Sequence, residues 1–246
     1  MQSAISTSNL HVHYGDETAL CDVTMELPVA SSLAVIGPNG SGKSTLLGVL
    51  AGTIDIATGT AVVSGQGPAL VLQSTDVDRS LPITVRDTVS LARYPSLGLF
   101  GRFTSEDRAA VQKAMKRLDI DDLAGRQFHE LSGGQRQRVL VAQGLAQESD
   151  VLLLDEPVTG LDITSREIIL DLIDDEVESG RTVVVTTHSL EEARLCNYVL
   201  LLDTEAIAFG APDEVLTEAH LRQAFGGGFI RVGDDFILDD PHHHSH

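Results

Sequence analysis

The sequence predicts an α/β fold with a mainly parallel sheet and an antiparallel β part near the N-terminus. A β-rich run, Leu33–Ile36, leads through a glycine-rich loop into an apolar helical pattern that Gly52 can end. Two continuous apolar runs, Val151–Leu154 and Val183–Thr186, are typical of parallel strands buried on both faces. The 246 residues, 42% hydrophobic and 22% charged, suffice for one large folded domain.

The glycine-rich loop has the pattern G-x-x-x-x-G-K-[ST], in the strand–loop–helix context that a phosphate-binding loop requires. Glycines let backbone N–H groups turn toward an anion, and the N-terminus of the following helix adds partial positive charge. The Lys43 ammonium would reach the terminal phosphates, and the Ser44 hydroxyl would bind Mg²⁺. The predicted nucleotide-binding residues are Gly37, Pro38, Asn39, Gly40, Ser41, Gly42, Lys43, Ser44 and Thr45.

Two acids, Asp155 and Glu156, follow the buried run Val151–Leu154. Ligand groups of open α/β sheets gather at the carboxyl ends of strands. We therefore expect Asp155 to hold Mg²⁺ through water and Glu156 to polarise the water that attacks the nucleotide. The alternative is a solvated strand end without a chemical role.

Gln73 and His188 also follow predicted strands, Ala69–Leu72 and Val183–Thr186. At the same sheet edge, Gln73 would touch Mg²⁺ or the attacking water, and His188 would touch the γ-phosphate or that water. Each residue has a structural alternative, because a single polar side chain at a strand end is often only part of the fold.

In chain order, the sequence holds a phosphate loop, a glutamine after a strand, LSGGQ at 131–135, a strand ending in Asp-Glu, and a histidine after a strand. Together these motifs resemble the ATP-binding-cassette (ABC) family, specifically the nucleotide-binding subunit of a membrane transporter, over about residues 5–225. The resemblance implies a P-loop NTPase core with an inserted α-helical signature subdomain. It also implies ATP hydrolysis with Mg²⁺ as cofactor, and it assigns Tyr14 to stacking on adenine.

By the same resemblance, the LSGGQ segment completes an ATP site that a second copy of the chain holds, so ATP lies at the interface of a homodimer. Ser132 is a helix N-cap residue whose hydroxyl can face its own helix or a ligand. The two glycines remove side chains, so that a γ-phosphate can approach the backbone. Arg136 and Arg138 follow, and we expect them to make surface ion pairs with the chain's many acids. The residues implied to act on the partner's ATP are Ser132, Gly133, Gly134, Gln135 and Asp162.

Two lobes and a tail are expected. Residues 1–73 and 150–225 would form the core lobe, and 74–149 a mainly helical lobe. Within the helical lobe, 104–120 predicts an amphipathic helix with Ala109 among its apolar positions, whereas 74–103 has turn and loop character.

The tail, residues 226–246, differs in composition from the rest of the chain. Its segment FIRVGDDFIL predicts a hairpin, and its last residues are rich in histidine. Such a cluster can bind Zn²⁺, Mn²⁺ or Ni²⁺ loosely, but a native tail without a metal role is favoured, and a purification tag is the alternative. The histidines are His242, His243, His244 and His246.

The formal net charge of −19 argues against nucleic acid as a partner, because phosphate backbones bind Lys and Arg surfaces. No run reaches the roughly 18 apolar residues that a membrane span needs. The two cysteines predict no disulfide framework. These features predict a cytosolic protein. The resemblance to ABC transporter subunits further implies a place at the cytoplasmic face of the membrane, held by a transmembrane permease subunit and served indirectly by an extracellular or periplasmic substrate-binding protein.

The segments 77–89, 91–111 and 207–227 resemble the ATPases of manganese/zinc/iron-type metal-ion importers, which predicts import of a divalent metal ion. ATPases of iron-siderophore or haem importers are the alternative. ABC ATPases of DNA repair or translation are a different class, typically with two cassettes, coiled-coil insertions or basic arms, and none of these occurs here. A nucleotide-binding regulator without turnover is opposed by Glu156 and His188.

Overall fold

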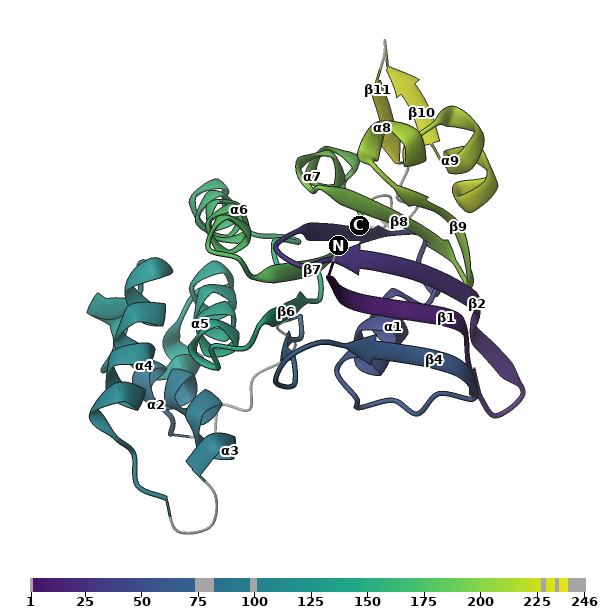
Figure 1. Cartoon of the computed structure of the whole chain (residues 1–246). Coiled ribbons are helices and arrows are strands. Elements are labelled where there is room, and N and C mark those ends of the chain that lie inside the picture. The colour runs from purple at the N-terminus through teal and green to yellow at the C-terminus, as the bar shows by residue number, and fades with distance from the viewer. Residues whose placement is uncertain (1, 74–81, 98–100, 227–228, 233–234, 239–246) are drawn as a thin grey trace. The chain divides into compact units, whose positions relative to one another are not determined.

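The computed structural model describes residues 2–73, 82–97, 101–226, 229–232 and 235–238. The chain divides into two compact units, unit 1 (residues 1–64 and 184–246) and unit 2 (residues 65–183). Figure 1 shows the strands and helices of both. Parallel and antiparallel strand pairs both occur, which confirms the predicted mixed α/β fold class. The boundaries expected for the core and helical lobes stay a prediction.

The antiparallel part of unit 1 consists of β1 (Ser3–Tyr14), β2 (Glu17–Pro28) and β4 (Thr58–Val63). β1 pairs with β2 on one edge and with β4 on the other, so that Ile5 lies opposite both Leu27 and Val63. Alternate side chains of β2 are buried, as expected for strands with one face on the core. The predicted antiparallel part is confirmed.

The parallel part of unit 1 is built on β3 (Ser32–Ile36), whose five residues are all buried. β3 runs parallel to β8 (Tyr198–Asp203), and β8 pairs antiparallel with β9 (Glu205–Gly210). β7 (Thr182–Thr187), which belongs to unit 1 from Val184 on, is buried throughout. Helix α7 (Leu190–Leu195) contacts β3, whereas α1 (Lys43–Leu50) contacts β2 and β4.

The C-terminal segment of unit 1 forms two helices and a hairpin (Figure 1). The helices are α8 (Pro212–Val215) and α9 (Glu218–Phe225). The predicted hairpin is confirmed, since β10 (Phe229–Val232) pairs antiparallel with β11 (Asp235–Leu238). The histidine-rich end of the tail, 242–246, lies outside the described residues.

In unit 2, β5 (Ala69–Val71) runs parallel to β6 (Val151–Leu154), and both lie where the sequence predicts strands. Helix α5 (Gly133–Ala146) packs on β5. The close approach depends on Gly144, because a Cβ there would overlap the side chain of Val71. Helix α6 (Ile163–Glu178) follows β6 in the chain.

The remaining helices of unit 2 are α2 (Val85–Ser90), α3 (Tyr94–Leu97) and α4 (Ser105–Arg117), with short 3₁₀ turns at 91–93, 121–123 and 128–130. The prediction of loop character for 74–103 is wrong over 85–97. Thr84 and Asp87 form a capping box there and start a helix. α4 confirms the predicted amphipathic helix, but Ala110 is buried where Ala109 was expected. Among the described helices, none is both long and apolar enough to cross a membrane.

Candidate functional site

The phosphate loop of unit 1 connects β3 to α1, as the sequence predicts. Helix α1 has Gly42 as its N-cap, with no side-chain hydrogen bond to its first turn and no acid in that turn. The first N–H groups of a helix have no partner within the helix and carry partial positive charge. This N-terminus can therefore bind an anion.

Glycines shape the loop for two different reasons. Gly42 has φ of 95°, and a Cβ there would lie 2.5 Å from the carbonyl oxygen of Ala19. Gly37 has no room for a Cβ because the Leu202 carbonyl lies against it. Gly40, with φ of 79°, has open space and serves the turn alone. The loop backbone is thus held tightly at both ends.

Two buried polar side chains face the inside of the loop. The Lys43 ammonium donates to the carbonyl oxygens of Gly37 and Pro38 at 2.8 and 2.9 Å, which fixes it within the loop. The Ser41 side chain is 2% exposed, and its hydroxyl has no hydrogen-bond partner among the described residues. A buried hydroxyl without a partner is costly unless a ligand or water supplies one. The loop therefore fits an anion. The other predicted residues of this loop, Asn39, Ser44 and Thr45, are exposed or half-buried.

Tyr14 and His188 are the other predicted site residues of unit 1. Tyr14 ends β1 with 53% of its surface exposed, as a residue that stacks on a ligand requires. His188 is half-buried directly after β7. The chain turns there into α7, because Ser189 caps that helix and its N–H donates to the Thr187 hydroxyl.

In unit 2 the structure brings two predicted residues together. The Gln73 side-chain amide donates to the Glu156 carboxylate at 3.3 Å. β5 and β6 are parallel neighbours, so their carboxyl ends place Gln73 beside the acids, and the Asp155 N–H donates to the Val71 carbonyl at 2.9 Å. Asp155 and Glu156 are both half-buried.

The backbone of Glu156 is unusual, since its φ is 46°. L-residues other than glycine enter this left-handed region only at a cost, and such residues cluster at functional sites. The conformation places the carboxylate at the end of β6 instead of continuing the strand. Six other described non-glycine residues, Glu148 among them, have φ between 45° and 60°, so the conformation alone assigns no role to Glu156.

The predicted signature residues lie at the start of α5. The Ser132 hydroxyl accepts the Gln135 N–H at 3.3 Å, and the Gln135 side chain accepts the Ser132 N–H at 3.1 Å, which is a capping box. The first turn of α5 contains no acid. Gly133 is exposed with open space around it, whereas Gly134 is buried.

Gly134 lies against the beginning of α6. A Cβ on Gly134 would overlap the Asp162 carboxylate and lie 2.5 Å from the Ser165 hydroxyl oxygen. Asp162 is exposed and caps α6 by accepting the Ser165 N–H at 2.9 Å. That backbone hydrogen bond lowers the pKa of the Asp162 carboxyl below its ordinary value. Sequence reasoning missed Ser165, whose only sequence signal is its place three residues after a capping acid.

The expectation of a surface ion pair is confirmed only in part for Arg138, whose guanidinium lies 3.9 Å from the exposed Asp119 carboxylate but is itself mostly buried. Arg138 is 9% exposed, and its guanidinium donates to the Leu118 and Asp119 carbonyl oxygens at 3.0 and 2.9 Å. These carbonyls end α4, so Arg138 ties the signature helix to the end of its neighbour. The helical periodicity of 133–146 places Arg138 on the buried face. The expectation of a surface position gave more weight to the many acids in the sequence than to this periodicity.

Comparisons with known proteins agree with these motifs. A family model described as ABC transporter matches residues 20–159. The manganese transport system ATP-binding protein MntB of Bacillus subtilis (strain 168) is 33% identical over 243 residues, covering 96% of this chain and 97% of that protein. The zinc transport system ATP-binding protein TroB of Treponema pallidum (strain Nichols) is 35% identical over 232 residues, covering 91% and 87%.

Solved structures give the same result. A chain of an inward-facing ABC transporter assigned to the metal-chelate type has a TM-score of 0.84 and 32% identity, with 96% of each chain covered. CbiO1 from Clostridium perfringens, part of the transporter complex cbiONQ, has a TM-score of 0.74 and 27% identity, covering 91% of this chain and 94% of that one. With its phosphate loop and its matches over most of both lengths, the chain is an ATP-hydrolysing, ATP-binding subunit that belongs to the ABC transporter family.

Proposed function

We propose that the chain hydrolyses ATP to energise the import of a divalent metal ion through a membrane permease. The proposed cargo rests on the chain's relatives. The chain matches ATP-binding proteins of manganese and zinc transport systems over nearly their whole lengths. The cargo would not touch this subunit. Its residues would bind ATP and orient the attacking water, and the closing of the ATP-bound dimer would be transmitted to the permease.

The phosphate loop would hold the triphosphate. Backbone N–H groups at the start of α1 and the Ser41 hydroxyl would donate to phosphate oxygens, and the Lys43 ammonium would neutralise the terminal phosphates. Tyr14 would stack on adenine, and its exposed ring leaves a face open for it. His188 would donate to the γ-phosphate.

The acids of unit 2 would serve the attacking water. Glu156 would accept a hydrogen bond from that water and polarise it, and the Gln73 amide, already bonded to the Glu156 carboxylate, would orient both. Ser44, Gln73 and Asp155 would hold Mg²⁺, which when bound neutralises charge on the phosphates. The donors fit that ion, because hydroxyl, amide and carboxylate oxygens are the ligands Mg²⁺ prefers.

A second copy of the chain would complete each ATP site, through Ser132, Gly133, Gly134, Gln135 and Asp162. The capping box supports this proposal. A hydroxyl has one proton to donate and two lone pairs, and the cap uses Ser132 only as an acceptor. Among the described residues no acceptor takes the Ser132 proton, so that it remains available for a phosphate oxygen of the partner's ATP.

The partners follow from this assignment. A transmembrane permease would hold the subunit at the cytoplasmic face of the membrane, and an extracellular or periplasmic binding protein would deliver the cargo to that permease.

A second candidate cargo, a chelated iron compound, has specific support. One similar structure is of the metal-chelate type, and the chelated iron transport protein YfeB of Yersinia pestis is 34% identical over 230 residues.

Glu156→Gln tests the enzymatic assignment. The amide keeps the size of the side chain but accepts protons poorly, so we expect ATP binding to persist while turnover falls by roughly 10²-fold or more. Size-exclusion chromatography with ATP should then show a trapped dimer. Glu167→Gln, an exposed change on α6, is the matched control and should keep wild-type turnover. Hydrolysis by Glu156→Gln at the wild-type rate would contradict the role of Glu156.

Uptake measurements test the cargo. Cells that lack this chain should lose uptake of radioactive manganese or zinc, and the wild-type gene, but not the Glu156→Gln variant, should restore it. If the deletion abolishes uptake of a ferric chelate and leaves manganese and zinc uptake intact, the second candidate cargo replaces the first.

A further inference from the structure

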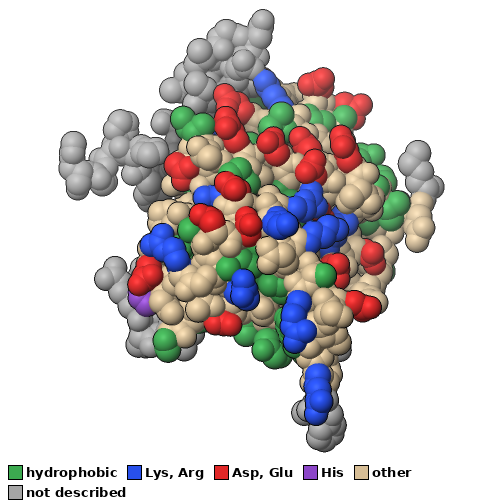
Figure 2. Space-filling view, turned by 90° about the vertical axis from the view of Figure 1, so that its left-hand side faces the viewer, with side chains coloured by type: hydrophobic (Ala, Val, Ile, Leu, Met, Phe, Trp, Pro, Cys, Tyr) green, Lys and Arg blue, Asp and Glu red, His purple; other side chains and the backbone are tan. Residues whose placement is uncertain are grey.

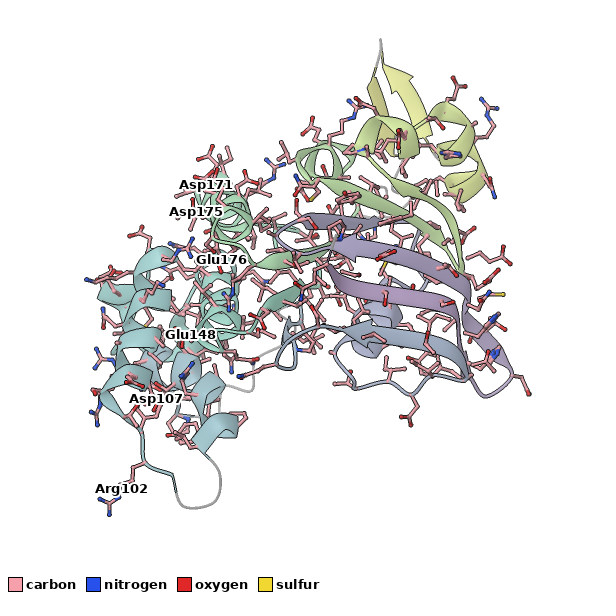
Figure 3. The ribbon with its side chains drawn as sticks, viewed as in Figure 1. Arg102, Asp107, Glu148, Asp171, Asp175 and Glu176 are labelled. Atoms are coloured by element: carbon pink, nitrogen blue, oxygen red, sulfur yellow. The ribbon has the colours of Figure 1, made fainter. Side chains whose placement is uncertain are left out.

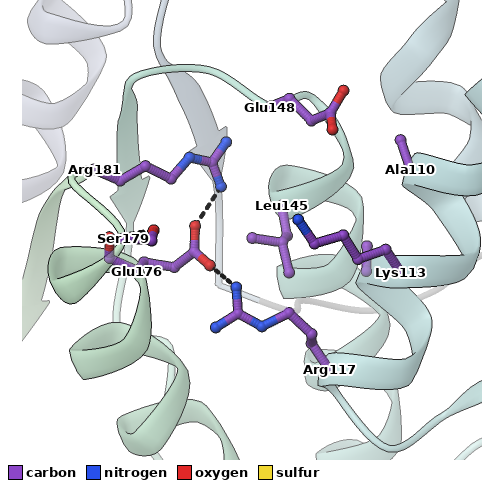
Figure 4. Close-up of a pocket in the computed structure, with 9 residues that line it drawn as sticks. Ala110, Lys113, Arg117, Leu145, Glu148, Glu176, Ser179 and Arg181 are labelled. Atoms are coloured by element: carbon purple, nitrogen blue, oxygen red, sulfur yellow. Dashed lines mark hydrogen bonds and ion pairs between the residues drawn. The ribbon is translucent and has the colours of Figure 1, made fainter. Parts of the chain in front are cut away.

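A cavity of about 230 Å³ lies within unit 2, and none of the residues assigned above to ATP lines it. Side chains from α4, from the ends of α5 and α6, and from the residue before β7 line it (Figure 4). Three of these side chains are cationic, namely Lys113, Arg117 and Arg181. Two lining side chains are acids, Glu148 and Glu176, so the lining carries one more cation than acids in a chain whose formal net charge is −19.

Glu176, which also lines the cavity, is buried, with 2% of its surface exposed. One of its carboxylate oxygens pairs with Arg117, and the other accepts from Arg181 at 2.6 Å. A buried carboxylate needs such partners, because its desolvation would otherwise cost several kcal/mol. Its single charge, shared by two guanidiniums, fixes both arginines at the cavity wall (Figure 4).

The other acids nearby, Glu148 in the lining and Asp175, are paired with arginines. Arg93, the partner of Glu148, also pairs with Asp107 at 3.0 Å. Glu148 pairs with Arg93 at 2.8 Å, and its carboxylate turns away from Glu176 in Figure 4. Asp175 pairs with Arg117 at 3.0 Å, but the Asp175 side chain is 65% exposed, where ion pairs contribute little. Figure 3 shows Asp175 and Glu176 on α6.

Positive charge without a partner remains. Lys113 extends from α4 into the cavity in Figure 4, and no ion pair is recorded for it among the described residues. The Nη2 group of Arg181 is buried and has no hydrogen-bond partner among those residues. On the face in Figure 2, several Lys and Arg side chains gather near the centre with acids around them. A buried donor without a partner, here the Nη2 group of Arg181, points to a missing acceptor, whereas Lys113 is exposed.

We propose that this cavity binds a small oxyanion of the phosphate type, either free phosphate or a phosphomonoester. Lysine and planar guanidinium groups are the side chains that bind phosphoryl oxygens best. The volume lies below the roughly 300–1,000 Å³ of pockets that take drug-sized ligands, so the occupant is small. The site is separate from the ATP-binding residues and does not depend on the proposed cargo.

The test is calorimetric titration of the full-length protein with inorganic phosphate, in a Lys43→Ala background that removes binding by the phosphate loop. We expect Lys113→Ala to weaken phosphate binding by about tenfold, the effect of one charge-assisted hydrogen bond. Lys116→Ala is the matched control, because Lys116 is an exposed lysine on the same helix that does not line the cavity. It should change the affinity by less than about twofold.

Thermal unfolding without phosphate checks that all three proteins fold alike. A parallel titration with glycerol phosphate distinguishes the two sources, since binding of both ligands indicates a phosphomonoester site and binding of phosphate alone indicates a free-ion site. The proposal is overturned if phosphate does not bind, if chloride at the same ionic strength produces the same heat, or if Lys113→Ala and Lys116→Ala behave alike.

Discussion

Helices α4 and α5 of unit 2 both begin with a capping box, but they differ in whether the hydroxyl proton of the N-cap residue is used within the cap. Thr104 and Asp107 form the capping box of α4, and Ser132 and Gln135 form that of α5. In α4 the Thr104 hydroxyl both accepts the Asp107 N–H and donates its proton to the Asp107 carboxylate at 2.7 Å. In α5 the glutamine accepts only from the backbone, and the serine proton stays free among the described residues.

The two helices also differ in the charge of their first turns. The first turn of α4 contains Glu106 and Asp107, which offset the positive end of the helix dipole. The first turns of α1 and α5 contain no acid. Among the described helices of eight residues or more, these two alone begin without an acid in the first turn or at the N-cap. Neither of the two helix ends that we propose to face phosphate carries an acid in its own first turn, although the Asp162 carboxylate of α6 lies beside Gly134 of α5.

The largest expected effect comes from Ser132→Asp. Aspartate caps helices as well as serine does, so the thermal stability should stay the same. The new carboxylate repels phosphate and cannot donate, so we expect ATPase activity to fall by roughly 10²-fold, as when one donor to a developing oxyanion is lost. Steady-state turnover measures this. Thr104→Asp makes the same change in α4 and should leave turnover intact; equal activity in both variants would refute the contrast.

Gly134→Ala should come next in size. The added Cβ overlaps the Asp162 carboxylate, so we expect a loss of about 1–3 kcal/mol in unfolding free energy, measured by urea titration. Gly133→Ala is the matched control, because nothing lies within 4 Å of its Cβ position. A Gly134→Ala protein as stable as Gly133→Ala would show that α5 does not need its close approach to the start of α6.

Thr104→Ala probes the closed cap of α4. Loss of this N-cap should reduce the unfolding free energy by about 1 kcal/mol and leave ATP turnover unchanged, because the cap serves the fold alone. Chemical denaturation and an ATPase assay on the same protein give both numbers. If ATP turnover falls while the unfolding free energy stays the same, the cap of α4 serves catalysis and not stability, which contradicts the role that we assign to it.

The smallest effect is confined to acid. The Thr104 backbone N–H, then the Thr104 hydroxyl and Arg93, lower the pKa of Asp107 from 3.8 to about 2. Because the folded value lies below the unfolded one, this stabilisation is fully present above about pH 4 and is lost as the pH falls toward 2. Asp107→Asn should flatten the pH dependence of the melting temperature in that window. An unchanged slope would contradict the assignment.

Local patterns in the sequence determined much of this protein. The phosphate loop, both strands that end in acids or glutamine, and the cap of α4 depend on residues within one turn or one strand. Their neighbours in the chain are enough to predict them. The pairing of Gln73 with Glu156 was also predictable in outline, since parallel strands bring their carboxyl ends to one edge.

Tertiary structure alone decided the rest. Whether Arg138 faces water or the end of α4 depends on how two helices pack, and the sequence pattern of acids pointed to the surface. The cavity unites Lys113, Arg117, Glu176 and Arg181 from segments far apart in the chain, none of which has a motif. Long-range packing brings such groups within the few ångströms over which charges and hydrogen bonds act, and no local pattern records that distance.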